Sequence, residues 1–296
     1  MDQNKFTVGV NNAFNYTSDP LHVELGSGTH QGHVRENNED SYLVMRFGRS
    51  LERLSTSLDE NLLEQNYSLT GYGMLVADGM GGMAAGEVAS SIAVAKLIEL
   101  IVDTSDWTLA LKRDKDVRTV TQRMNQRFFE IDKILKEEAR SDDALGGMGT
   151  TLTVAGTLGS DLVLGHIGDS RAYLLRGTSF NQLTTDHTLA QALIDAGVAN
   201  SDDPAPRSMR HVLTAAIGSF DEHIEPQVQH FRLYNGDQLL LCTDGLTEMV
   251  EDDIIASVLR EAKSAPIACQ NLIDLALGAG GTDNITVVVA RFSKSA

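Results

Sequence analysis

The order of apolar and amphipathic segments predicts an α+β fold in which antiparallel sheets are flanked by helices. Strand-like runs come in adjacent groups, at 151–155, 161–167 and 171–176 and again at 228–233 and 238–242. Two long helical patterns separate them from the earlier strands, and two more close the chain. This order favours antiparallel sheets over a doubly wound parallel sheet, in which strands and helices would alternate strictly.

Four segments carry apolar residues at helical spacing. They cover 88–102, 117–135, about 252–263 and about 266–278. The stripe of the first helix that we expect to face the core consists of Val88, Ile92, Ala95, Ile98 and Val102. Asp252 or Asp253 is expected to cap the third helix, and Pro266 suits the opening turn of the fourth.

The remaining segments are less regular. Residues 1–20 are polar and are expected to form a loose arm or an irregular edge strand, ahead of a single domain at 21–296. The turn-prone stretch 26–40 is interpreted as a solvated loop. Residues 49–70 contain leucines spaced for a weak helix, and they form either a surface excursion between two strands or an element that docks a partner.

Acidic residues mark the ends of the strand-like runs. Three of these runs end in an aspartate beside glycine, and two further runs are preceded by acids: these residues are Asp78, Asp169, Asp244, Asp283, Glu39 and Asp40. If antiparallel strands bring these ends to one rim, several carboxylates converge. Because like charges repel, such a cluster makes sense around cations.

The ligand chemistry indicates which cations. Oxygen ligands without a histidine or cysteine pattern select Mg²⁺ or Mn²⁺, and calcium stays possible although no EF-hand loop is present. Two such ions about 3.5–4 Å apart can activate a water and stabilise an in-line displacement, which suits phosphoester hydrolysis. Arg35 lies close to Glu39 and Asp40, and its planar guanidinium is the first candidate to hold the phosphate.

Composition limits the partners and the compartment. The chain has 296 residues, with 24 lysines and arginines against 41 acids, a net charge of −17. That balance argues against nucleic acid or an anionic membrane as a partner. The sequence contains neither a signal-peptide pattern nor a run of roughly 20 apolar residues, so we expect a cytoplasmic protein. Cys242 and Cys269 are interpreted as buried thiols.

Six segments in order carry a resemblance to a known family. They are Arg35–Asp40, Asp78–Gly82, Gly149–Thr151, Gly168–Tyr173, Thr243–Gly245 and Thr282–Asn284. Each is weak alone, but the ordered set, which spans residues 29–290, resembles the PPM (PP2C-type) metal-dependent serine/threonine phosphatases of the bacterial branch. The resemblance implies a central β-sandwich of two antiparallel sheets, with helices on both outer faces and a binuclear Mg²⁺ or Mn²⁺ centre at one end.

The resemblance also implies residue roles. Asp78 would bridge two metals, the Gly79 carbonyl would bind one, and Asp244 and Asp283 would bind the other. Glu39 and Asp40 would act directly or through metal-held waters, and Asp169 with Asp244 matches positions for a third, weaker ion. Arg35 would hold the phosphate, which gives Arg35, Asp78 and Asp244 the catalytic roles. Asn284 would contact the metal-binding residues without binding a metal itself, and residues 149–151 would shape the floor of the cleft.

One departure concerns the proton donor. Where the eukaryotic branch places a histidine proposed as general acid, this chain has Met80, which cannot donate a proton. His33, His187, or a water on a third ion near Asp169 remain as alternatives. Residues 185–220 correspond to a mobile flap beside the cleft, in which Arg207, Arg210 and His211 either meet a phosphopeptide or belong to a plain loop.

The function predicted is hydrolysis of phosphoserine and phosphothreonine in proteins by a metal-activated water. The expected partner is a phosphorylated protein, such as a serine/threonine kinase or its targets, and the expected state is a monomer. A regulatory phosphoprotein-binding module on the same fold is the alternative, which the retained acids disfavour. A calcium-stabilised structural protein is a third reading, disfavoured by the dispersed ligands.

Overall fold

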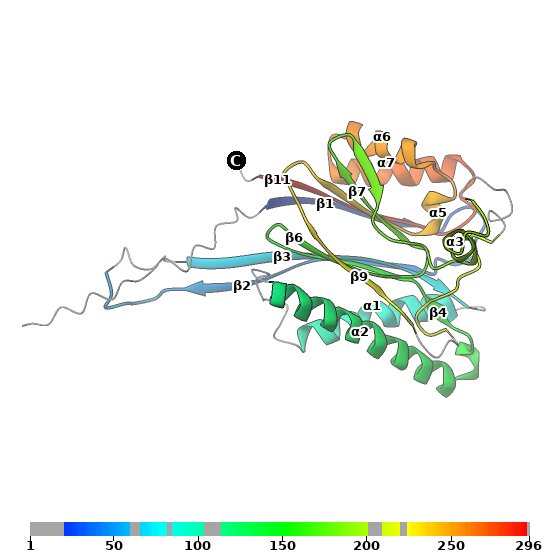
Figure 1. Ribbon diagram of the computed structural model, residues 1–296, viewed down its shortest axis with the longest axis horizontal. Coiled ribbons are helices and arrows are strands. Elements are labelled where there is room, and N and C mark those ends of the chain that lie inside the picture. Colours follow the sequence, from blue (N-terminus) through cyan, green and yellow to red (C-terminus); the bar gives the residue numbers. More distant parts are fainter. Residues whose placement is uncertain are drawn as a thin grey trace, which may run out of the picture.

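The computed structural model of the chain describes residues 21–59, 66–81, 85–103, 114–200, 209–219 and 224–294. They form two antiparallel sheets packed face to face, with helices on the outer face of each (Figure 1). The predicted α+β class and the β-sandwich implied by the resemblance are confirmed. The expected arm at 1–20 lies outside the described residues. No helix within the described ranges is long and apolar enough to span a membrane.

The first sheet has five strands and the second has six. All pairings between the described strands are antiparallel. The first sheet has the order β1-β11-β10-β7-β8, with β1 (Leu21–His30), β7 (Arg171–Arg176), β8 (Ser179–Gln182), β10 (Gln238–Cys242) and β11 (Ile285–Lys294). The second sheet has the order β2-β3-β5-β6-β9, with β2 (Asp40–Glu52), β3 (Asn66–Met80), β5 (Leu152–Leu158), β6 (Asp161–Ile167) and β9 (Gln227–Arg232). Its sixth strand, β4 (Gly149–Thr150), pairs with the end of β3. The short β4 and β8 were not predicted.

The four long helices predicted are all present, and the described residues contain three short ones as well. Helices α1 (Ala85–Val102) and α2 (Asp114–Ser141) cover the second sheet, and α6 (Asp252–Glu261) and α7 (Ala265–Gly278) cover the first (Figure 1). The short helices are α3 (Leu189–Asp195), α5 (Asp244–Thr247) and a 3-10 helix at Asp143–Leu145. The expected cap of α6 was wrong, because Glu251 holds that position and Asp252 and Asp253 lie in the first turn.

Helix α1 buries a different face from the predicted stripe. Its buried side consists largely of small residues, Ala85, Ala89 and Ala93, followed by Leu97. Val102, which the stripe placed in the core, is 67% exposed. The alanines let the helix backbone approach the sheet closely, so the larger side chains flank the contact instead of filling it.

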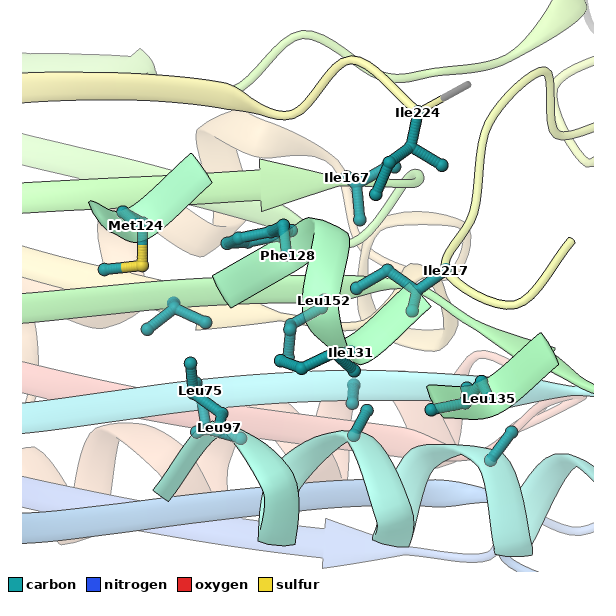
Figure 2. Packing of buried hydrophobic residues seen from close by; sticks show 14 of the residues in the cluster. Leu75, Leu97, Met124, Phe128, Ile131, Leu135, Leu152, Ile167, Ile217 and Ile224 are labelled. Atoms are coloured by element: carbon teal, nitrogen blue, oxygen red, sulfur yellow. The ribbon is translucent and has the colours of Figure 1, made fainter. Parts of the chain in front are cut away.

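Strand alternation explains the long apolar runs. In β10, Leu239 and Leu241 enter the layer between the sheets, whereas Leu240 and Cys242 pack against the helices. Both faces are buried, so the strand is apolar throughout instead of alternating. Figure 2 shows the layer between the second sheet and helices α1 and α2, where Phe128 and Ile131 lie over Leu152. Cys242 and Cys269 are buried free thiols, as predicted.

Two predictions from residue patterns were wrong. Residues 26–30 are not a loop but part of β1. Gly26, which suggested a turn, is needed for packing, because the backbone of Ala265 in α7 comes so close that a Cβ at this position would collide with it. The weak helix at 49–70 is absent from the described part of that range, because the β2–β3 ladder runs on until Glu52 lies opposite Asn66. These two strands extend past the others in Figure 1; residues 60–65 lie outside the described ranges.

Candidate metal centre

The acids of the second sheet lie in the same row as its inner core. Met74 and Val76 of β3 pack between the sheets, and because side chains alternate along a strand, Asp78 continues that inner row. The same rule extends the inner row of β2 to Asp40. Asp40 and Asp78 are direct partners in the ladder, so both carboxylates enter the space between the sheets at one end of the sandwich.

The first sheet contributes two hydroxyl groups that contact Asp40. Thr243 follows β10 and Thr286 lies in β11, each continuing an inner row of apolar residues. Their Oγ1 atoms donate to Asp40 Oδ2 at 2.8 Å and 2.6 Å. Asp40 is therefore fixed across the sandwich, with one carboxylate oxygen engaged and the other left for a different partner.

The remaining predicted acids join the same cluster. Asp169 follows β6, Asp244 opens α5 and Asp283 precedes β11. Burial raises the pKa of Asp78 well above its usual value, and the charges of Asp40, Asp244, Asp169 and Asp283 raise it further, in that order. Such mutual effects require short separations, so the structure brings together acids from distant parts of the chain.

Four more acids of the cluster have raised pKa values. Burial raises the pKa of Asp40 to about 7, although the two threonine hydroxyls act to lower it. Burial is also the main cause of the raised pKa values of Asp169, Asp244 and Glu39. Buried carboxyls that are crowded in this way resist ionisation unless a cation offsets their charge.

Two oxygens of the cluster lack any partner. Asp40 Oδ1 and Asp244 Oδ1 are buried and accept no hydrogen bond. Unpaired buried polar atoms are costly and rare, and here they belong to carboxylates surrounded by other carboxylates. This donor set consists of oxygens, which fits a hard cation such as Mg²⁺ or Mn²⁺.

The loop between β1 and β2 is fastened to Asp283 and its neighbour. Arg35 Nη2 donates to Asp283 Oδ2 at 2.6 Å, and its side chain stays 53% exposed at the edge of the cluster. Asn284 accepts from the Glu39 amide at 2.8 Å and donates through Nδ2 to the carbonyls of Gln31 and Asn37. Asn284 therefore sets the path of the loop that carries Arg35 and Glu39.

The backbone around Asp78 is held by the segment 149–151. The Asp78 carbonyl accepts from the Thr151 amide and from Thr150 Oγ1, both at 2.9 Å, and the Asp78 amide donates to Thr151 Oγ1 at 2.9 Å. Gly79 has no room for a side chain, because a Cβ would collide with the Gly86 carbonyl at the start of α1. These contacts give Thr150 and Thr151 a supporting role.

Two further residues reach the cluster that sequence reasoning did not place there. His211, Asp244 and Glu248 offer ligand atoms that lie within 4.8 Å of one another, and His211 Nδ1 lies 2.5 Å from Glu248 Oε1. Burial and the charge of Asp244 raise the pKa of Glu248 to about 7. The four-residue spacing of Asp244 and Glu248 could have revealed Glu248, but no sequence signal placed His211 beside them.

The candidate proton donors lie in different surroundings. His33 is exposed, and its amide donates to the Gly281 carbonyl at 2.7 Å. His187 is partly buried, and its Nδ1 accepts from the Gly168 amide at 3.0 Å. In the predicted flap, Arg210 is exposed, whereas Arg207 lies outside the described residues.

Comparison with known proteins identifies the family of the chain. The family model described as protein phosphatase 2C matches residues 61–268. Protein phosphatase PhpP of Streptococcus pneumoniae serotype 2 is 32% identical over 92% of this chain and 98% of its own. The crystal structure of the Mycobacterium tuberculosis serine/threonine phosphatase PstP/Ppp superposes with a TM-score of 0.73 and 31% identity, covering 92% and 99% of the two chains.

A further structure concerns the metal. The catalytic domain of serine/threonine protein phosphatase PstP in complex with two manganese ions has a TM-score of 0.71 and 32% identity, covering 92% of this chain and 99% of its own. The fold and the acid cluster thus define a metal-dependent phosphatase. The chain belongs to the protein phosphatase 2C family and is a serine/threonine protein phosphatase.

Proposed function

We propose that this cluster holds two Mg²⁺ or Mn²⁺ ions and hydrolyses phosphoserine and phosphothreonine in protein substrates. The observation that carries the proposal is the pair of buried, unpartnered oxygens, Asp40 Oδ1 and Asp244 Oδ1, inside a group of mutually repelling acids. Asp78 would contact both ions, with Gly79 on one side and Asp244 and Asp283 on the other. Glu39 and Asp40 would bind directly or through water.

The ions, Arg35 and the two threonines have separate roles in this proposal. The ions, when bound, supply the positive charge that lowers the pKa of a water and stabilises the attacking and leaving oxygens. Arg35 would orient the phosphate: its contact with Asp283 engages Nη2 alone, and a guanidinium has five N–H donors in a fork that suits phosphate. Thr243 and Thr286 hold Asp40 in place throughout.

A third ion would lie on the α5 side of the cluster, near Asp169 and Asp244. Glu248 and His211 are the residues that favour this position, because their ligand atoms converge with that of Asp244. His211 comes from the predicted flap, so an ion there would link the flap to α5. Asp169→Asn should weaken binding of this ion, which a Mn²⁺ titration followed by calorimetry would detect as one fewer weak site.

The proton for the leaving alkoxide has three candidate sources, since Met80 offers none: His33, His187, or a water near Asp169. A substitution of His33 that lowers kcat for alkyl phosphates but not for aryl phosphates, whose leaving groups need no acid, would identify His33 as the donor.

The test is hydrolysis of a phosphothreonine peptide by the purified protein, titrated with MnCl₂ and MgCl₂ against EDTA. Asp244→Asn should abolish turnover, whereas Asp274→Asn, an exposed acid of α7, should leave it unchanged. Arg35→Lys should raise KM, because an ammonium lacks the planar fork. Metal binding without turnover in the unaltered protein would reject the proposal and favour the regulatory phosphoprotein-binding module.

A further inference from the structure

Two histidines form a parallel stack behind the turn that carries Asp169. His166, in β6, is completely buried. Its ring lies 5.1 Å from that of His187, measured between centroids, with 12° between the ring planes. His187 belongs to the opening residues of the flap predicted at 185–220. The stack therefore joins a core strand to the base of the flap.

The hydrogen bonds of His166 determine where its proton lies. Its Nε2 faces the Thr185 carbonyl oxygen at 3.2 Å, and because a carbonyl only accepts, Nε2 carries the hydrogen. Nδ1 is then the acceptor for Thr153 Oγ1 at 2.9 Å. Burial lowers the pKa of His166 to about 3, so this ring is a neutral and fixed base for the stack.

His187 holds the Gly168–Asp169 turn through two hydrogen bonds. Its amide donates to the Gly168 carbonyl at 2.7 Å, and its ring Nδ1 accepts from the Gly168 amide at 3.0 Å. An accepting Nδ1 has no hydrogen, so the hydrogen of this ring is on Nε2. Both backbone groups of Gly168 are thus satisfied by one residue.

The turn is confined on its opposite side as well. Gly168 has a φ of +106°, in the left-handed region that favours glycine. A Cβ at this position would lie 2.5 Å from the side chain of Thr151, the residue that hydrogen-bonds the backbone of Asp78. Gly168 therefore lies between His187 and the support of Asp78, so that a displaced His187 would shift Asp169 relative to Asp78.

The returning arm of the flap meets the same residue. The Thr214 amide donates to the His187 carbonyl at 2.8 Å. Three residues later Ile217 pairs with Thr150 and buries its side chain in the core cluster that also contains Leu135 (Figure 2). The outgoing and returning arms of the flap are thus joined at His187, one hydrogen bond from the Asp169 turn.

We propose that His187 is a positioning residue that couples the flap to the Asp169 carboxylate, so that both keep one geometry relative to Asp78. It acts through the turn and does not touch the reacting atoms. The inference deepens the proposed function and rests on it, since Asp169 matters here as a ligand of the third ion.

A matched pair of substitutions isolates the Nδ1 contact. In His187→Asn the side-chain oxygen can take the place of Nδ1 and accept from Gly168, whereas in His187→Gln the amide group extends toward the place of Nε2. For the Gln variant we expect the Mn²⁺ concentration at half-maximal rate to rise at least fivefold, with kcat largely recovered at saturating Mn²⁺. For the Asn variant we expect values within twofold of the unaltered protein.

These outcomes separate positioning from other roles. Equal losses of kcat in both variants would overturn the proposal and make His187 the proton donor. Unchanged Mn²⁺ dependence in the Gln variant would leave His187 with a structural role only, and would also overturn it.

A second measurement needs neither a variant nor turnover. Ring ¹⁵N shifts of the unaltered protein should show His187 as the Nε2–H tautomer, and amide exchange should show the Gly168 N–H to be protected. The Nδ1–H tautomer, or a Gly168 amide that exchanges as fast as an exposed one, would refute the proposed role of His187. This result would count even if no phosphatase activity were found.

Discussion

Asp40 and Asp78 lie directly opposite each other in the β2–β3 ladder and both continue the inner apolar rows of their strands. The row that packs the sandwich therefore ends in two facing carboxylates. One oxygen of Asp40 is held by Thr243 and Thr286, and the other has no partner. The centre is built at the cost of electrostatic repulsion that a cation would relieve.

Asp40→Asn should therefore stabilise the metal-free protein. The amide oxygen can still accept from both threonines, while a charge that raises the pKa of Asp78 disappears. With about 1.4 kcal/mol for each pKa unit, and allowing for the unpaired amide NH₂, we expect a gain of about 1–3 kcal/mol at pH 7.5. Chemical denaturation in EDTA measures it.

The same substitution should reduce the stabilisation that Mn²⁺ gives, because one ligand oxygen is replaced by a weaker one. Asp274→Asn serves as the control and should change neither quantity. A metal-free Asp40→Asn protein that is less stable than the unaltered one would show that the repulsion in the cluster is unimportant.

The pH dependence of stability in EDTA follows from the acids and histidines together. An acid whose folded pKa is raised binds its proton more tightly when folded, so its contribution to stability falls as pH rises toward that pKa. Asp40 and Glu248, with folded pKa values of about 7, lose stability up to that pH. His166, with a folded pKa of about 3, acts in the opposite sense below its unfolded value of about 6.5.

The clear window starts at pH 6.5, where most of the histidine contribution has been gained, and passes through the folded pKa of about 7 of Asp40 and Glu248 to pH 8. We expect the free energy of unfolding in EDTA to fall across this window and Mn²⁺ to restore it. Urea titrations at four pH values test this. A metal-free protein whose stability increases from pH 6.5 to 8 would not have the raised acid pKa values described.

Asn284→Ala should loosen the loop that carries Arg35 and Glu39. It removes one acceptor and two donor contacts from a side chain that is 5% exposed, and buried groups left unpaired cost about 1–3 kcal/mol each. We expect a loss of about 2–4 kcal/mol in urea unfolding, together with weaker Mn²⁺ binding. Asn181→Ala, at an exposed position of β8, is the matched control, and equal losses in the two variants would contradict this role.

Gly26→Ala should destabilise the fold by about 1–3 kcal/mol, the usual cost of overpacking. The new methyl group would meet the backbone of Ala265 and Pro266, which cannot move aside as a side-chain end would. Gly156→Ala in β5 provides the control, because no heavy atom lies within 4 Å of the added Cβ. Thermal melting of both variants decides the matter: a neutral Gly26→Ala would mean that β1 and α7 are not in such close contact.

This contact also shows what the sequence could and could not predict. Strands with both faces buried, such as β10 and β11, were predictable because their apolar runs are unbroken. The end of β1 was not, since Gly26 and Gly28 have the local pattern of a turn and are required only by α7, which lies more than 200 residues away.

The site residues likewise include some that the sequence could predict and some that it could not. Asp78, Asp169, Asp244 and Asp283 lie at strand ends, so their convergence could be predicted from antiparallel pairing. His211 reaches Glu248 only through the path of the flap, and that path depends on distant contacts such as Ile217 with Thr150. The β2–β3 extension was missed because the leucine spacing at 49–62 favours a helix locally, whereas the ladder between the strands imposes pairing.

The most direct test of the proposed centre is anomalous diffraction at the manganese edge from crystals grown with MnCl₂. We predict two strong peaks that share Asp78, one of them bounded by Asp244 and Asp283, and a weaker third peak beside Glu248. Crystals of catalytically active protein with no manganese at Asp78, or with manganese only elsewhere on the surface, would contradict the account.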